Sequence, residues 1–206
     1  GTPWVNITRN SARSACAALG SKYALISNAQ WQTIARNIEQ VASNWSGGAV
    51  GVGAVNRGHS SGSSVLAADE DDTNACVGTG ATCSDTIWHD KRRTNYLSNG
   101  EVIWDLGGNA AEWVYDDCLG LQTSGITLCP RELNTLSAAN RPILGPSDPT
   151  WYSAHGLGQA CDGNAGAVLR GGAVGSGQKV GIFSSDLTRG TGLMSSGFSF
   201  RCVWNP

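Results

Sequence analysis

Charged residues are scarce in this sequence: only 15% of its 206 residues are Asp, Glu, Lys or Arg, and the formal net charge is −2. Binding to nucleic acid or to an anionic membrane surface requires a dense positive field, which this balance does not supply. We therefore expect neither nucleic acid nor a membrane surface among the partners of the protein.

Long apolar runs are also missing. No segment has the uninterrupted apolar length of a membrane helix, so we expect no membrane insertion. The length suits a single large domain over residues 1–206. The chain opens on Gly1-Thr2-Pro3, without an initiator Met or a signal peptide. We interpret it as a processed domain or C-terminal tip of a longer protein whose targeting signal lies elsewhere.

Recognisable catalytic motifs are absent as well. The three histidines, His59, His89 and His155, stand in no HExxH, GxSxG or triad context. Asp116 and Asp117 are adjacent, and neighbouring acids on a strand point to opposite faces instead of forming a pair. We therefore predict that the protein is not an enzyme.

Seven cysteines are present, without a CxxC pair or a Cys/His metal spacing. This pattern favours disulfides and an oxidising compartment, and hence an extracellular or cell-surface location. The alternative is that several are reduced, buried thiols. Cysteines bracket two short loops, which predicts the bridges Cys76–Cys83 and Cys118–Cys129 and leaves Cys161 without a predicted partner.

Two helices are expected near the start of the chain. The first spans residues 11–19 and ends before Gly20; its apolar face comprises Ala12, Ala15, Cys16 and Leu19. The second is capped by Asn28. Its apolar stripe, which we expect to face the core, comprises Trp31, Ile34, Ala35, Ile38, Val41 and Ala42.

Two later segments each have two interpretations. The acidic run from Asp69 to Asp72 could hold a second cation, but a solvated loop is favoured. The segment PSDPTWYSAHGLGQ groups Trp151, Tyr152 and His155. These side chains either stack on a sugar ring or a partner protein, or Trp151 folds back onto the domain.

The most informative stretch is SNGEVIWDLGGNAAEWVY, residues 98–115. Its glycine pair allows positive φ angles and so a curl that aims carbonyl oxygens at one point. The Asp105 and Glu112 carboxylates and the Gly108 and Ala110 carbonyls then offer two anionic and two neutral oxygens. Such a set suits a hard cation such as calcium; the alternative is a tight turn whose acids cap backbone amides.

The segment NYLSNGEVIWDLGGNAAEWVY resembles the central signature of formylglycine-generating-enzyme (sulfatase-modifying-factor) domains, a branch of the C-type lectin-like fold. The C-terminal part is also similar, at Arg170-Gly171-Gly172, Gly181-Ile182-Phe183 and Phe200-Arg201-Cys202. The likeness covers almost the whole chain. It implies an α+β, C-type lectin-like fold with two early helices, small antiparallel sheets, many loops and disulfides.

The resemblance also implies particular contacts. In the family the central segment binds calcium, so a structural calcium ion is the cofactor we expect, with ligands mapping onto Asp105, Gly108, Ala110 and Glu112. The family's first tryptophan of this motif is Ala111 here, which supplies no ligand. C-type lectin-like domains join their first helix to their last strand, which implies the disulfide Cys16–Cys202.

One departure concerns catalysis. Active members of the family carry two reactive cysteines after the RGG motif, at places that fall here at about Ser176 and Gly181. A thiolate is needed to hold copper and activate oxygen, and neither serine nor glycine provides one. We therefore expect no copper. The EPN and QPD signatures of calcium-dependent sugar binding are absent too.

Non-catalytic members of the family serve as receptor-binding tips of bacterial and phage adhesins or fibres, and as variable proteins of diversity-generating retroelements. The resemblance thus implies a non-enzymatic adhesin or receptor-binding fibre-tip domain that recognises a cell-surface glycan or protein of another cell. The alternative is a retroelement-diversified display protein. A homo-oligomer, such as a trimer, would form through upstream fibre sequence.

In such proteins the binding residues lie between the RGG motif and the last strand. Here those positions are mostly small or polar, which suits a polar ligand such as a surface glycan. They are Val174, Gly175, Ser176, Gln178, Lys179, Ser184, Asp186, Thr188 and Arg189, with Trp151, Tyr152 and His155 as supporting candidates.

Overall fold

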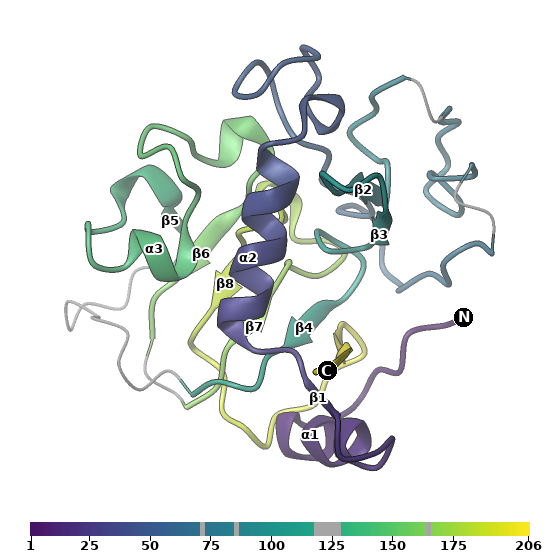
Figure 1. Cartoon of the computed structure of the whole chain (residues 1–206), viewed down its shortest axis with the longest axis vertical. Coiled ribbons are helices and arrows are strands. Elements are labelled where there is room, and N and C mark those ends of the chain that lie inside the picture. Colours follow the sequence, from purple (N-terminus) through teal and green to yellow (C-terminus); the bar gives the residue numbers. More distant parts are fainter. Residues whose placement is uncertain (71–72, 85–86, 118–128, 164–165) are drawn as a thin grey trace.

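The computed structural model describes residues 1–70, 73–84, 87–117, 129–163 and 166–206. Over these residues the protein has α+β architecture: helices cover one six-stranded sheet, and two two-stranded sheets lie beside it. In Figure 1 the long helix α2 crosses in front of the main sheet, and the C-terminus lies near α1.

Helix α1 (Arg9–Ala17) begins two residues before the predicted start. Thr8 caps it, because its hydroxyl accepts the Ser11 amide. Ala12 and Cys16 are fully buried, as predicted. Leu19 lies beyond the end of the helix and is 60% exposed, so its assignment to the apolar face was wrong.

Helix α2 (Asn28–Glu39) is capped by Ser27 and not, as predicted, by Asn28. The Ser27 hydroxyl accepts the Gln30 amide, and the Gln30 side chain accepts the Ser27 amide, which forms a capping box. The predicted stripe packs on the core through Trp31, Ala35 and Ile38, whereas Val41 and Ala42 lie past the helix end and are more exposed.

The main sheet has the strand order β5–β6–β8–β7–β4–β9. Its strands are β4 (Ala111–Trp113), β5 (Arg131–Glu132), β6 (Gln159–Cys161), β7 (Leu169–Arg170), β8 (Ser185–Asp186) and β9 (Phe198–Phe200). The pairs β4–β9 and β6–β8 are parallel. The predicted antiparallel pairing therefore holds for three of the five strand pairs of this sheet and is wrong for the other two, where long crossover loops allow the chain to return in the same direction.

The small sheets are antiparallel, as expected. Strand β1 (Tyr23–Leu25) pairs with β10 (Cys202–Trp204), and β2 (Thr94–Tyr96) pairs with β3 (Val102–Trp104). The first pair joins early and late parts of the chain, and the disulfide Cys16–Cys202 fastens α1 to β10. This disulfide confirms the pairing that the family resemblance implies.

Short helical turns complete the described structure: η1 (Ala42–Asn44), η2 (Leu133–Thr135), α3 (Arg141–Leu144), η3 (Ser153–His155) and η4 (Gly177–Lys179). The larger of two core clusters lies between α2 and the sheet, where the Trp31 indole donates to the Ile182 carbonyl. The smaller one surrounds Trp113 and the buried face of α1.

Two further disulfides are formed. Cys76–Cys83 confirms the prediction, but Cys129 bonds to Cys161, so the predicted Cys118–Cys129 bridge is wrong. The antiparallel pairing of β5 with β6 brings Cys129 beside Cys161, with 4.3 Å between their Cα atoms. Cys118 lies outside the described residues.

Three disulfides indicate that the protein folds in an oxidising compartment. In the described part of the chain, every helix is too short or too polar to cross a membrane.

Candidate functional site

The two sequence signatures meet in space. The Gly171 carbonyl of the RGG motif accepts the amides of Gly108 and Gly181, and the Val174 amide donates to the Asn109 carbonyl. Gly171 has a φ of +82°, and a Cβ there would lie 2.8 Å from the Leu106 carbonyl oxygen. Only glycine permits this approach, so the central loop (residues 105–112) and the RGG turn form one unit.

The curl of the central loop forms, but only one of the two predicted glycines takes a positive φ angle. Positive φ angles occur at Asp105 (52°), Gly108 (82°) and Asn109 (62°), and not at Gly107. Asn109 tolerates this conformation because its short side chain bonds locally. Its amide group exchanges hydrogen bonds with the backbone of Leu66 and donates to the Asp105 carboxylate. The sequence interpretation overlooked this role of Asn109.

The loop around His59 supports the same curl. The His59 carbonyl accepts the Asn109 amide, and its ring lies 2.9 Å from the Ser64 carbonyl oxygen. A Cβ at Gly108 would lie 2.6 Å from the Arg57 carbonyl oxygen. The segment NRGHSSG, residues 56–62, thus supports the central loop through its backbone.

Each acid of the central loop is held by an arginine. Arg93 donates from Nε and Nη2 to the two Asp105 oxygens, at 2.9 and 2.6 Å. Arg201 donates from Nε and Nη2 to the two Glu112 oxygens, both at 2.5 Å. The side chains of Asp105 and Glu112 are only 12% and 8% exposed. Bidentate pairing neutralises both carboxylates.

This pairing bears on the predicted calcium ligands. Asp105, Ala110 and Glu112 line one hollow of about 200 Å³ beside Arg201, and Gly108 does not line it. Two carboxylates and two guanidinium groups already balance in charge, and a calcium ion would add two buried positive charges. While both arginines are in place, this donor set does not fit calcium. Calcium at these residues stays a prediction.

Five of the predicted ligand-binding residues come together around one pocket of about 170 Å³. They are Ser176, Lys179, Ser184, Asp186 and Arg189. We call this the RGG pocket, because Gly172 of the motif also lines it. Its wall combines strands β4, β6, β7, β8 and β9 with the η4 turn, so residues far apart in sequence converge.

Other predicted positions lie outside the pocket wall. Gln178 is exposed on η4. The Val174 side chain lies beside Gly62 instead: its Cγ2 atom is 3.6 Å from where a Cβ on Gly62 would stand. Gly175 is exposed, and its amide donates to the Ser60 carbonyl. Thr188 donates its hydroxyl to Asp186 and so supports a pocket residue.

The sequence interpretation missed several wall residues. Gln159, Ser185 and the Cys129–Cys161 disulfide line the pocket, as do Ala111 and Phe198. Ala111 was noted only as the place of a family tryptophan; its small side chain leaves space here. The unassigned Cys161 was the one sequence feature that could have indicated the Cys129–Cys161 part of this wall, because it lacked a predicted disulfide partner.

The RGG pocket carries an unbalanced positive charge. Asp186 accepts the Arg189 Nε at 2.8 Å, and the Arg189 side chain is still 45% exposed. Lys179 is exposed and has no ion-pair partner among the described residues. The pocket wall thus presents an ammonium group, a half-exposed guanidinium and hydroxyls to whatever enters it.

The candidate aromatic loop divides into buried and exposed parts. Trp151 is only 9% exposed, and its ring packs edge-on against Trp45 with centroids 4.8 Å apart. Of the two interpretations of this segment, Trp151 follows the second: it folds back onto the domain, because the core takes up its indole. Trp151 is therefore not an exposed stacking platform. Tyr152 remains 37% exposed beside His155, on the η3 turn next to η4.

Glu132 anchors this loop to the sheet. Its carboxylate accepts the Ser153 amide and hydroxyl and the Gln159 side chain. Burial alone would raise the pKa of Glu132, but the bonds from Ser153 and Gln159 lower it below the ordinary 4.5. The ionised Glu132 carboxylate thus connects Ser153, the neighbour of Tyr152, to Gln159 of the pocket wall.

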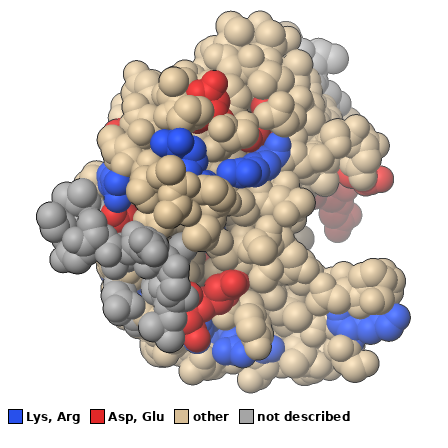
Figure 2. All heavy atoms as spheres, turned by 60° about the vertical axis from the view of Figure 1, so that its left-hand side comes forward, with Lys and Arg blue, Asp and Glu red and all other residues tan. Residues whose placement is uncertain are grey.

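Surface charge is mixed on the face drawn in Figure 2. Lys and Arg side chains and Asp and Glu side chains lie there in small, separate groups. Neither sign forms one continuous patch over the coloured part of this face.

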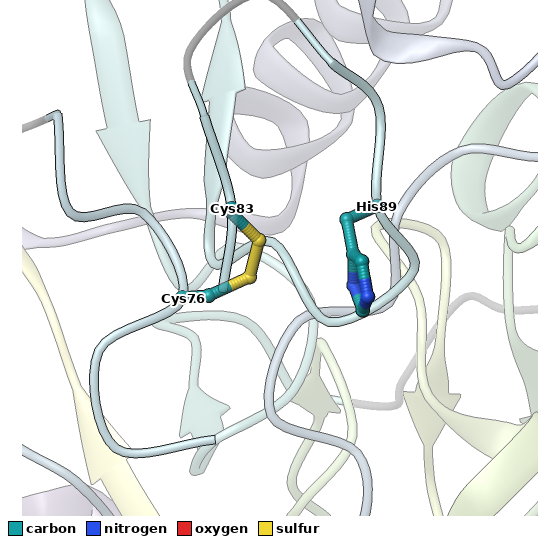
Figure 3. A group of neighbouring side chains, drawn as sticks. All are labelled: Cys76, Cys83 and His89. Atoms are coloured by element: carbon teal, nitrogen blue, oxygen red, sulfur yellow. A yellow bond between two sulfur atoms is a disulfide. The ribbon is translucent and has the colours of Figure 1, made fainter. Parts of the chain in front are cut away.

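Two other groups resemble metal sites. Cys76, Cys83 and His89 offer ligand atoms within 4.8 Å of one another, but Figure 3 shows the two sulfurs joined in a disulfide beside the imidazole. A disulfide lacks the thiolates that bind zinc. In the acidic run, the Asp69 carboxylate accepts the Asn74 amide, and Asp71 and Asp72 lie outside the described residues.

Comparisons with known proteins give no independent assignment: neither a protein-family model nor a curated protein matches this chain.

Proposed function

We propose that the protein is a non-enzymatic, extracellular ligand-binding domain of the C-type lectin-like, formylglycine-generating-enzyme type, serving as an adhesin or receptor-binding fibre tip. The main support for this proposal is that five predicted binding residues converge on the RGG pocket. Its volume of about 170 Å³ suits one small polar group, such as a single sugar unit of a cell-surface glycan.

An acidic group on the ligand is favoured by the charge of the pocket. Lys179 lacks an ion-pair partner among the described residues, and Arg189 is only partly covered by Asp186. Ser176 and Gln159 add hydrogen-bonding groups, and Phe198 adds an apolar wall. A sugar carboxylate or sulfate would meet both the positive charge and these neutral groups.

Binding is favoured over oxidase chemistry by the backbone around the two expected cysteine positions. A Cβ at Gly181 would lie 2.2 Å from the Leu157 carbonyl carbon, so no side chain fits there. Ser176 lines the pocket but carries a hydroxyl and no thiol. Catalysis of the formylglycine-generating type needs a thiolate pair, which these two positions do not supply.

One shallow pocket gives modest affinity, so adhesion would require several copies on one fibre. This supports a homo-oligomer assembled through upstream sequence. A retroelement-diversified display protein would use the same scaffold, and a template repeat beside a reverse-transcriptase gene would identify it.

The experiment is a screen of the folded domain, clustered on beads, against glycan arrays and whole cells. Ala111→Leu places a larger apolar side chain in the wall of the RGG pocket and is expected to abolish binding. Ser14→Leu adds an apolar side chain at an exposed position of α1 and serves as the control. Equal binding by Ala111→Leu and the parent, with both proteins folded, would place the ligand site elsewhere.

A further inference from the structure

The two acids of the central loop need a cation to neutralise them. The family resemblance places calcium there, whereas the described contacts place the guanidinium of Arg201 against the same oxygens. Arg201 stands between β9 and β10 and donates to both Glu112 oxygens. Its Nη2 also lies 3.3 Å from the Trp104 and Asp105 carbonyl oxygens.

These contacts give one guanidinium four oxygen partners of the kind that calcium takes: two carboxylate oxygens and two backbone carbonyls. The Arg201 side chain is 21% exposed, and its guanidinium lies 5.4 Å from the centroid of the Trp31 ring. Burial alone would lower the pKa of Arg201, but Glu112 and then Asp105 raise it. The guanidinium therefore stays charged at every physiological pH.

Charge counting favours the arginine over a metal ion. Arg93 neutralises Asp105 and also donates to the Leu66, Ala67 and Val77 carbonyls. Arg201 neutralises Glu112, so the cluster has no net charge. A divalent ion entering it would have to displace a guanidinium or leave two positive charges uncompensated.

Space for an ion lies on the accessible side of the cluster. The hollow of about 200 Å³ is lined by Asp105, Asn109, Ala110, Glu112 and Arg201. Removal of the Arg201 head group would leave the Glu112 carboxylate and the nearby carbonyls facing this water-accessible space. Such oxygens would attract a hard divalent cation.

We infer that Arg201 is the resident cation of the central loop, so that the protein needs no divalent metal there, and that loss of its guanidinium creates a calcium-binding site. This inference is independent of the proposed ligand-binding function, because the RGG pocket contains neither Arg201 nor Glu112.

The test is thermal unfolding of the parent and of Arg201→Gln, each with EDTA, calcium chloride or magnesium chloride. The parent is expected to unfold at the same temperature in all three. Arg201→Gln is expected to be less stable in EDTA and to gain roughly 5–10 °C at a hundredfold excess of calcium over its dissociation constant. Magnesium should act more weakly, since it demands stricter geometry.

Terbium luminescence sensitised by Trp104 provides a second readout. Arg201→Gln should give saturable emission that disappears when Glu112→Gln is added. Arg189→Gln removes a guanidinium from another carboxylate, Asp186, and should give no such signal. If Arg201→Gln requires help to fold, calcium in the refolding buffer should restore it.

Two results would overturn the inference. Destabilisation of the parent by EDTA would make calcium the resident cation, as the family resemblance implies. An Arg201→Gln protein that neither responds to calcium when folded nor folds in its presence would exclude the latent site.

Discussion

The central loop and the RGG pocket lie on opposite faces of the same two strands. On β4, Ala111 lines the RGG pocket and its neighbour Glu112 lines the hollow of the central loop; on β9, Phe198 and Ser199 divide in the same way. Successive side chains of a strand alternate between faces, which accounts for these two pairs, while Phe200 at the end of the edge strand β9 also lines the hollow. On one face the charges are paired and nearly buried, and on the other face Lys179 and Arg189 remain open.

The difference shows which kind of residue marks a site. The acids of the central loop have the more conspicuous pattern, yet both are neutralised by arginines from elsewhere in the chain. The RGG pocket is built from ordinary serines, a lysine and a glutamine, but it retains charge and hydrogen-bonding groups beside open space. Unpaired polar groups beside open space indicate binding more directly than clustered acids do.

Among changes that separate the two faces, the largest effect is expected at the disulfide beside the RGG pocket. Replacing both Cys129 and Cys161 by alanine opens a loop of 32 residues and should cost about 3.5 kcal/mol of unfolding free energy. Ligand binding should weaken as well, because the bridge forms part of the pocket wall. Denaturant unfolding and binding to the screened ligand measure the two effects.

The matched control removes the Cys76–Cys83 bridge, which closes a loop of only seven residues. It should cost about 2.5 kcal/mol and leave binding unchanged. Equal loss of binding in both variants would mean that global stability, and not the pocket wall, governs recognition.

The next largest effect is expected from breaking the Glu112–Arg201 ion pair in the central loop. Glu112→Gln leaves the Arg201 guanidinium largely buried without its carboxylate and should cost about 3 kcal/mol. Glu101→Gln, at an exposed position, should change the unfolding free energy by less than about 0.5 kcal/mol. A cost as small at Glu112 as at Glu101 would contradict the closed, charge-balanced description of the central loop.

A smaller effect is expected from pH, through Glu132. Because hydrogen bonds lower the pKa of Glu132 in the folded protein, its contribution to stability is present above the ordinary pKa of 4.5 and is lost as the pH falls through the folded pKa. Glu132→Gln should flatten this part of the stability curve. Unfolding scans between about pH 5 and pH 3 would reveal it, and an unchanged slope would refute the anchor.

Much of this structure was predictable from local patterns. The two early helices, the Cys16–Cys202 bridge and the curl of the central loop follow from apolar spacing, the placement of glycines and the family resemblance. Five pocket residues were named from their position after the RGG motif.

The remainder depends on contacts between distant segments. The residues next to Asp105 and Glu112 in sequence do not predict their ion-pair partners. Arg93 binds Asp105, and Arg201 binds Glu112, only in the folded chain. The burial of Trp151 requires Trp45, and the bridge from Cys129 to Cys161 requires the pairing of β5 with β6. Local sequence patterns indicated which residues matter, but their contact partners depend on the tertiary fold.

The most direct test of the account is a charge reversal at Lys179, compared with the same reversal at Lys22. Both lysines are exposed, and both variants change the net charge equally, but only Lys179 lines the RGG pocket. We predict that Lys179→Glu lowers affinity for the screened cell-surface ligand at least about tenfold, the equivalent of one charge-assisted contact, while Lys22→Glu binds like the parent. Unchanged binding by folded Lys179→Glu, or equal loss in both variants, would contradict recognition through the RGG pocket.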